Sequence, residues 1–378
     1  MSTTSSRAAD RTYIAAIDSQ IFSLKASIQV LEGKKLRAQE RLNSYAYPVL
    51  TLPNEIVSEI FVQFLPVYPS PPPISGPLSP TSLSHICRRW RQVALSTPTL
   101  WRAISLPDFY STGNGVLHSI LEVWLGRSGC LPLSIDMEEI WNTVDESCLE
   151  LIALHRSRWE YVTLAVDDEF ELLAIQGPMP LLRQFEIRVE APRPGPLAIR
   201  FCEVPRLRSV TLWDITRPTD LFPWSQLTSL TSIHSPIENT AILQLAVNLV
   251  HCHLMLRPGE IPLSDVRLRS LESLVLAQMW DWDDTVTHYL KTMITPSLRT
   301  LEVPEAFLQP SPIDTLRLFI SKSGCRLQGL CITGQVRSEA VYRDAFSSSI
   351  PELSFDRALI DYDAYSSANL ARKKYIVL

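Results

Sequence analysis

Leu207-Arg208-Ser209-Val210-Thr211-Leu212 is the stretch of this sequence that decides the fold. Its apolar residues stand at the first, fourth and sixth positions, and the same spacing recurs through the second half of the chain. The other copies are Trp159-Val162-Leu164, Leu182-Phe185-Ile187, Leu249-Cys252-Leu254, Leu271-Leu274-Leu276, Leu298-Leu301-Val303 and Leu327-Leu330-Ile332, with a degenerate copy at Leu227-Leu230. They start at residues 159, 182, 207, 227, 249, 271, 298 and 327. These intervals between successive copies are typical of proteins that stack one small structural repeat on the next.

Helical patterns separate several of these copies, over residues 238–248, 283–294 and 313–321. A strand followed by a helix, repeated along the chain, predicts a curved solenoid built on a parallel sheet. The spacing resembles that of leucine-rich repeats, in an irregular form. We therefore expect an α/β fold, with a leucine-rich-repeat-like, substrate-binding domain over residues 107–378.

The third and fifth side chains of each copy point away from the apolar face, because side chains alternate along a strand. In a parallel sheet they would form one continuous strip. We predict that this strip binds a protein substrate through Tyr161, Gln184, Ser209, Thr211, Ser229, Thr231, His251, His253, Ser273 and Thr300.

The strip contains no Arg or Lys, and beside it Arg183 and Arg208 stand at the second position of adjacent repeats. Recognition of a phosphorylated peptide normally needs clustered Arg. The strip therefore favours a neutral or mildly basic protein surface, independent of phosphorylation. The alternative is that loops or helices cover it.

A small helical unit is predicted upstream, over residues 46–106. It opens with Leu52-Pro53-Asn54-Glu55-Ile56, where Pro53 suits the first turn of a helix. A second amphipathic helix is expected around residues 83–94, with Leu83, Ile86, Cys87, Trp90 and Ala94 as its apolar stripe. Between them, residues 66–80 include seven prolines, which predicts a semi-rigid loop.

The combination of Leu52-Pro53-x-Glu55-Ile56, Cys87-Arg88-x-Trp90 and Pro98-x-Leu100-Trp101 resembles the F-box motif. It looks most like the form found in large fungal F-box families, and the proline insert departs from the usual compact domain. The resemblance implies that the unit binds a small Skp-type adaptor, which in turn binds a cullin scaffold. The matching positions are Leu52, Pro53, Ile56, Ile60, Cys87 and Trp90. Each of them either touches the adaptor or belongs to the core of the F-box.

A long helix is predicted at the start of the chain, over residues 1–45. Apolar residues recur there at alternating three- and four-residue steps, the seam of a coiled coil. These seam residues are Ile14, Ile17, Ile21, Leu24, Ile28 and Leu31. Two outcomes stay open: the helix pairs with a second copy, or it docks on its own chain.

Composition and motifs argue against several other classes of protein. The net charge of −5 gives no general attraction to nucleic acid or anionic membranes. Seven scattered cysteines without CxxC spacing indicate reduced thiols, in cytoplasm or nucleus, and no zinc module. His251 and His253 supply too few ligands for a metal, and Asp281, Asp283 and Asp284 lack the glycine of a calcium loop. We expect no cofactor, no metal, no catalytic residues and no membrane span.

Two functions remain. The first is the substrate-receptor subunit of a cullin-based, SCF-type ubiquitin ligase, which is not itself an enzyme. The second is a non-degradative repeat scaffold that dimerises through its N-terminal helix. Binding of a Skp-type adaptor separates the two.

Overall fold

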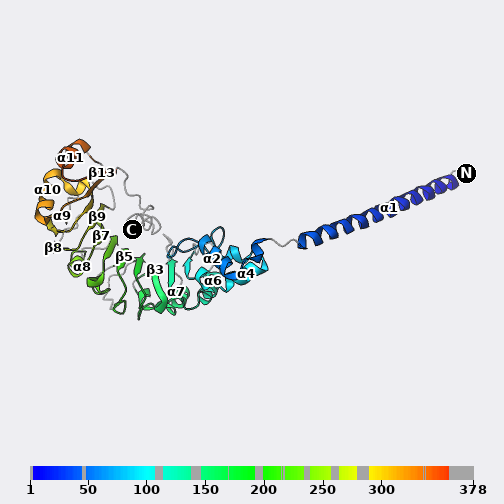
Figure 1. The fold of residues 1–378 in the computed structure, drawn as a ribbon, viewed down its shortest axis with the longest axis horizontal. Helices are drawn as coiled ribbons and strands as arrows, with labels where there is room; N and C mark the ends of the chain where they lie inside the picture. Colours follow the sequence, from blue (N-terminus) through cyan, green and yellow to red (C-terminus); the bar gives the residue numbers. More distant parts are fainter. Residues whose placement is uncertain are drawn as a thin grey trace. The chain divides into compact units, whose positions relative to one another are not determined.

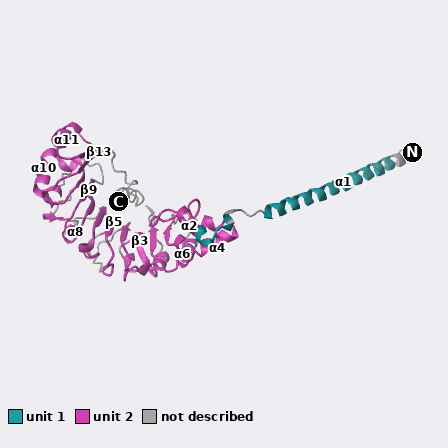
Figure 2. Ribbon diagram, viewed as in Figure 1, with its two compact units in different colours: residues 1–57 teal, residues 58–378 magenta. Residues whose placement is uncertain are grey.

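The computed structural model describes residues 3–44, 48–106, 114–137, 146–168, 170–191, 199–213, 215, 218–233, 239–256, 264–278, 289–334, 336 and 338–356. The chain divides into two compact units, residues 1–57 and residues 58–378 (Figure 2). Asp281, Asp283 and Asp284, discussed above as a possible cation loop, lie outside the described residues. No helix among the described residues combines the length and the apolar character needed to cross a membrane.

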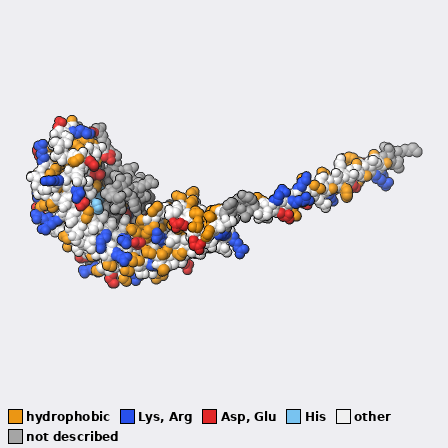
Figure 3. Space-filling view, viewed as in Figure 1, with side chains coloured by type: hydrophobic (Ala, Val, Ile, Leu, Met, Phe, Trp, Pro, Cys, Tyr) orange, Lys and Arg blue, Asp and Glu red, His pale blue; other side chains and the backbone are white. Residues whose placement is uncertain are grey.

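The first unit is dominated by one long helix, α1 (Thr3–Ser44), followed by a 3-10 turn, η1 (Pro48–Thr51). The seam residues predicted from the sequence, Ile14 to Leu31, are all exposed along α1. In Figure 3, apolar side chains alternate with charged ones along this helix. The helix confirms the expected element, and the partner of its seam stays a prediction.

Helix α2 (Asn54–Phe64) begins directly after Pro53 and crosses the boundary between the units. Residues 65–79 then contain neither helix nor strand, as the prolines predict. The second predicted helix is in fact two, α3 (Pro80–Ser84) and α4 (Arg88–Leu95). A 3-10 turn, η2 (Pro98–Leu100), follows them.

The break between α3 and α4 corrects the predicted apolar stripe. Cys87 is extended and caps α4, because its sulfur accepts the backbone N–H of Trp90 at 3.4 Å. Leu83 and Ala94 are buried as predicted, but Ile86 is exposed. The apolar residues of the sequence therefore keep a helical spacing across a position at which the helix ends.

An 11-stranded sheet forms the body of the second unit, and every pairing given for its strands is parallel. Its order follows the chain: β1-β2-β3-β4-β5-β6-β7-β9-β11-β12-β13. The strands are β1 (Ala103–Ser105), β2 (Leu133–Met137), β3 (Trp159–Val166), β4 (Gln184–Val189), β5 (Ser209–Trp213), β6 (Ser229–Ile233), β7 (His251–Leu256), β9 (Ser273–Gln278), β11 (Thr300–Pro304), β12 (Gly329–Thr333) and β13 (Glu352–Asp356). A second, two-stranded sheet pairs β8 (Val266–Arg267) with β10 (Met293–Ile294).

Helices and 3-10 turns connect the strands along one side of the sheet (Figure 1). The helices are α6 (Asn114–Arg127), α7 (Glu146–Ala153), α8 (Asn239–Leu245), α9 (Tyr289–Thr292), α10 (Pro312–Ser323) and α11 (Glu339–Phe346). The 3-10 turns are η3 (Arg156–Arg158), η4 (Glu171–Leu173), η5 (Pro218–Asp220), η6 (Trp224–Gln226) and η7 (Glu305–Leu308). Strand, connector, strand, all in one direction, confirms the α/β, leucine-rich-repeat-like architecture.

The repeated apolar triplets form a large part of the core of the second unit. Every residue named in the eight copies, from Trp159 to Ile332, is buried. The 11-stranded sheet also contains three strands that the spacing did not single out, β1, β2 and β13. Their triplets begin with residues other than leucine: Trp101-Ile104-Leu106, Pro132-Ile135-Met137 and Ile350-Leu353-Phe355.

Candidate functional site: the helical unit and the open face of the sheet

Helix α2 divides its apolar residues between a buried and an exposed face. Val57 and Phe61 are 2% and 1% exposed, and stand four residues apart on the inner face. Ile56 and Ile60 are 49% and 47% exposed, and share the outer face for the same reason. Phe64 continues that outer face and is also exposed. Figure 3 also shows apolar side chains gathered on the surface in the region of α2 and α6.

The other predicted adaptor-binding residues fall into two groups. Pro53 is exposed and Leu52 is half-buried at the start of α2. Trp90 is half-buried, and its ring meets Phe61 edge-on with centroids 5.0 Å apart. Together with the capping bond of Cys87, this gives Cys87 and Trp90 structural roles within the unit. Whether either also touches an adaptor stays a prediction.

The proline-rich loop is fastened to the first repeats by Tyr68. Its hydroxyl donates to Glu160 Oε2 at 2.8 Å, while Arg183 Nε donates to Glu160 Oε1 at 2.7 Å. The Arg102 guanidinium lies over the Tyr68 ring, 3.8 Å from its centroid. The Tyr68 ring also meets Tyr161 edge-on at 5.7 Å. Burial, with the Glu160 carboxylate beside it, raises the pKa of Tyr68 above its usual value.

This fastening was not anticipated from the sequence. The loop adds one further bond, because Ser134 Oγ donates to the backbone carbonyl of Pro69 at 2.6 Å. Pro72 within it is buried. The contact with Tyr161 also means that the first residue of the predicted strip already packs against the loop.

The strand register aligns the predicted strip into two rows on one face of the sheet. This face, opposite the buried triplets, is called the open face. The first row runs Tyr161, Gln184, Ser209, Ser229, His251, Ser273 and Thr300. The second runs Thr163, Glu186, Thr211, Thr231, His253, Val275 and Glu302. Each member lies directly opposite the next, so the alignment expected from the repeats is present.

Burial separates the two rows. The first row is half-buried to exposed, and His251 and Thr300 are its most open positions. In the second row Glu186, Thr211 and Thr231 are buried. Two predicted substrate-binding residues, Thr211 and Thr231, are therefore not surface residues in this structure, and the first row presents the accessible polar side chains.

A third row follows, which the sequence analysis did not identify. It consists of Trp213, Ile233, Met255 and Ala277, a buried apolar cluster next to one another on adjacent strands. Trp213 Nε1 donates to Glu186 Oε1 at 2.8 Å, and the Arg188 guanidinium lies 4.1 Å from the Trp213 ring centroid. The available signal was an apolar residue directly after the sixth position of these copies.

The arginines beside the strip are engaged in local contacts. Arg183 pairs with Glu160, as described above. Arg208 donates to the backbone carbonyls of Pro205 and Leu207 at 3.1 and 2.8 Å. Both guanidinium groups are therefore engaged locally at the starts of β4 and β5, which weakens them as a pair for binding phosphate.

The His251-Cys252-His253 segment follows strand alternation. His251 is exposed and Cys252 is buried on the opposite face. Burial raises the pKa of the Cys252 thiol to about 12, so the thiol is neutral at physiological pH. Across the described parts of the chain, no group of three His, Cys, Asp or Glu side chains is arranged to hold a metal ion.

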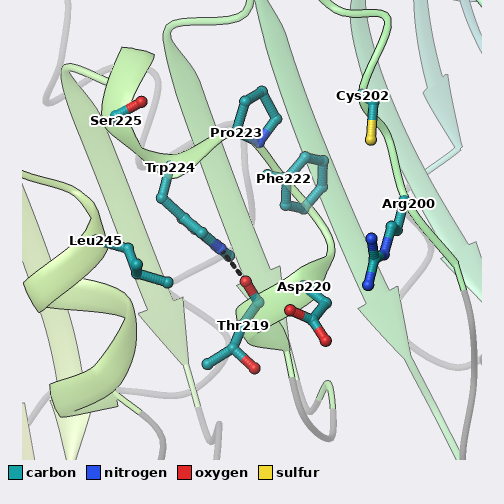
Figure 4. A pocket seen from close by; sticks show the side chains of 9 residues that line it. All are labelled: Arg200, Cys202, Thr219, Asp220, Phe222, Pro223, Trp224, Ser225 and Leu245. Atoms are coloured by element: carbon teal, nitrogen blue, oxygen red, sulfur yellow. Dashed lines mark hydrogen bonds between the residues drawn. The ribbon is translucent and has the colours of Figure 1, made fainter.

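One cavity of about 340 Å³ opens among the connectors near α8 (Figure 4). Arg200, Cys202 and Asp220 contribute its polar chemistry, and Trp224 forms part of its wall. Trp224 Nε1 donates to the carbonyl of Thr219 at 2.7 Å, which fixes the indole (Figure 4). The nine lining residues include no histidine beside the thiol. They therefore do not form a Cys–His nucleophile pair.

Comparison with known proteins assigns the helical unit. No curated protein matches this chain significantly. A family model does match part of it. Residues 49–107 match the family model described as F-box-like. That range starts just before Pro53 and extends past Trp101, so it includes the exposed face of α2 and the capped helix α4. Residues 49–107 are therefore an F-box-like domain, and a long parallel-sheet region consistent with repeats follows it.

Proposed function

We propose that this protein is the substrate-receptor subunit of a cullin-based, SCF-type ubiquitin ligase. The F-box-like domain binds a Skp-type adaptor and, through it, the cullin. The repeats, which we take to be irregular leucine-rich repeats, bind a protein substrate. The receptor performs no chemistry in this proposal. It raises the effective concentration of substrate lysines near the ubiquitin thioester carried by other subunits.

The exposed apolar face of α2 is the observation that carries the proposal. Two isoleucines one turn apart remain about half exposed in a domain that buries their neighbours Val57 and Phe61. Full burial of an isoleucine side chain stabilises by about 1.5–3 kcal/mol. Ile56 and Ile60 therefore offer a favourable surface to an adaptor, with Leu52 and Pro53 as the adjoining segment.

Calorimetric titration with a recombinant Skp-type adaptor tests this assignment. The double variant Ile56→Asp, Ile60→Asp removes two candidate hot spots and should lower the affinity about 30-fold or more, which corresponds to about 2 kcal/mol. Leu154→Asp, which adds the same kind of charge at an exposed apolar position outside the F-box-like range, is the matched control. Equal affinity of the folded double variant would contradict the contact assignment. No binding by the unmodified chain would contradict the receptor proposal itself.

The first row of the open face is the proposed substrate site. Its accessible residues are polar and uncharged or histidine, and Glu302 and Glu352 add negative charge near its C-terminal end. This composition supports a neutral or mildly basic protein ligand. His251→Arg should weaken substrate capture and leave adaptor affinity unchanged. Loss of capture after phosphatase treatment of the substrate would contradict the phosphate-independent mode.

The second candidate is a scaffold that dimerises through α1. The exposed heptad seam favours it, since Ile and Leu at these positions are typical of two-stranded coiled coils. Deleting residues 1–42 should then convert a dimer into a monomer in light scattering. A monomeric full chain contradicts self-pairing at that concentration. A dimer that binds no adaptor favours the scaffold over the receptor.

A further inference from the structure

The cavity near α8 has walls from three connectors that hydrogen bonds join to one another. The connector between β4 and β5 meets the next one where Phe201 N–H donates to the Leu221 carbonyl at 2.8 Å. Gln226 Nε2 also donates to the Val204 carbonyl at 2.7 Å. Asn248, after α8, donates through Nδ2 to a backbone carbonyl of the second connector at 2.7 Å. The protein itself makes each of these bonds, so the cavity is pre-formed, as binding sites usually are.

Aromatic rings form the floor of this cavity. Phe222 and Trp224 are buried and meet edge-on, with ring centroids 5.5 Å apart. Phe201 stacks against Phe222, with centroids 5.3 Å apart. Leu245 of α8 is 48% exposed and lies beside Trp224 (Figure 4). An apolar side chain that enters the cavity therefore leaves water for a surface of rings and aliphatic carbon, which is favourable.

Arg200 and Asp220 place opposite charges at the same end of the cavity. Both side chains are exposed, come from different connectors and point toward the same space (Figure 4). In the part of the chain that the structure describes, the two side chains form no ion pair. A guanidinium only donates hydrogen bonds and a carboxylate only accepts them. A peptide group has one acceptor and one donor, so it matches this pair without carrying a charge.

We propose that this cavity binds a short, extended peptide segment through one bulky apolar side chain. The side chain packs on Trp224 and Leu245, and the adjoining peptide group accepts from Arg200 and donates to Asp220. The cavity volume of about 340 Å³ is at the lower end of the range for ligand sites, which suits about one or two residues. The site lies on the connectors and not on the first row, and its occupation requires no adaptor.

Alkylation of Cys202 in the full chain measures occupation of the cavity. Cys202 is exposed and lines the cavity, whereas Cys130 is exposed elsewhere and serves as the internal reference. The capped tripeptide Ac-Ala-Leu-Ala-amide, at millimolar concentration, should slow the reaction of Cys202 with iodoacetamide severalfold and leave that of Cys130 unchanged. Mass mapping of the labelled peptides gives both rates. Ac-Ala-Ser-Ala-amide lacks the bulky apolar side chain and should slow neither reaction.

Matched substitutions identify the contacts, with Kd taken from the dependence of the alkylation rate on peptide concentration. Leu245→Asp should raise the Kd of the leucine tripeptide about tenfold. Val247→Asp, at a position that is also 48% exposed but lies outside the cavity, should leave the Kd unchanged. Arg200→Ala and Asp220→Ala each remove one charged hydrogen-bond partner and should raise the Kd about tenfold. Arg206→Ala, an exposed arginine outside the cavity, is their control.

Four results would overturn the proposal. The first is an unchanged rate at Cys202 with the leucine tripeptide, or an equal effect of the serine tripeptide. The second is an unchanged Kd in Leu245→Asp. The third is equal protection by acetate or methylammonium alone, which would make the site a site for charge and not for a peptide group. The last is protection that rises with protein concentration in the absence of peptide, which would assign the cavity to a second copy of the chain.

Discussion

Replacing Tyr68 by phenylalanine removes one hydroxyl from the junction between the proline-rich loop and the repeats. The hydroxyl donates to Glu160 at 2.8 Å, and the ring keeps its contacts with Arg102 and Tyr161 without it. The change therefore isolates one hydrogen bond. Glu160 retains its bond from Arg183, so its carboxylate stays paired.

The size of the expected stability loss follows from the charge of the acceptor, Glu160, and from the partial exposure of Tyr68. A hydrogen bond to a charged group contributes about 1.5–3 kcal/mol. Tyr68 is only half-buried and its acceptor keeps a second donor, so we expect a loss of about 1–2 kcal/mol from the free energy of unfolding. In a double-mutant cycle with Glu160→Gln, most of that loss should appear as coupling energy.

The pH dependence gives the same bond a second signature. The pKa of Tyr68 is raised in the folded state, chiefly by burial and then by Glu160, whereas an unfolded tyrosine ionises near pH 10. The folded state therefore holds the proton that the unfolded state releases. The stability advantage over Tyr68→Phe should be constant below about pH 9 and decline as the pH rises through 10 and above.

Urea denaturation of both proteins at several pH values measures these quantities. Tyr13→Phe is the matched control, because Tyr13 is exposed on α1 and should change nothing. Equal stability of Tyr68→Phe and the unmodified protein, or no coupling to Glu160, would refute this account of how the loop is held.

Three further substitutions test the cap, the core and the buried polar contact. Cys87→Ala removes the acceptor at the start of α4 and should cost about 0.5–2 kcal/mol in urea denaturation, with Cys87→Ser as the conservative control. Leu274→Ala, at a fully buried triplet position, should cost about 2–5 kcal/mol, whereas Leu245→Ala at an exposed position should stay within about 0.5 kcal/mol. Trp213→Phe removes the indole donor to buried Glu186 and should cost about 1–3 kcal/mol. A cost for Leu245→Ala equal to that for Leu274→Ala would contradict the assignment of the core face, and unchanged stability of Cys87→Ala or Trp213→Phe would contradict the corresponding contact.

The repeated triplets were predictable because they record burial directly. A residue such as Leu274 must be apolar wherever the strand meets the core, and its interval from the next copy follows from the size of one repeat. The same logic overlooked β1 because Trp101 belongs at once to the F-box motif and to the first triplet. Its strand follows the helical unit directly, so no separate spacing marked it.

The helix break at Cys87 shows what periodicity leaves out. Leu83 and Ala94 have the spacing of one helical face. Spacing does not show, however, where a side chain accepts a backbone N–H and so allows the helix to end. The Cys87 sulfur accepts the N–H of Trp90, which lets the chain end one helix and begin another. Ile86 then falls in the connection and becomes exposed.

The open face of the sheet shows a second limit of sequence analysis. The sequence predicts the direction in which a side chain points, but not whether that side chain is accessible. Alternation along a strand correctly gave the side of the sheet on which Ser209 and Thr211 lie, because it depends only on the backbone. Accessibility depends on what lies above the strand, and Thr211 is buried while Ser209 remains partly open. The buried cluster around Trp213 occupies the same face one step further along the strands. The first row is therefore the accessible part of this face, with His251 and Thr300 as its most accessible side chains, and substitutions there test the proposed substrate binding with the least risk to the fold.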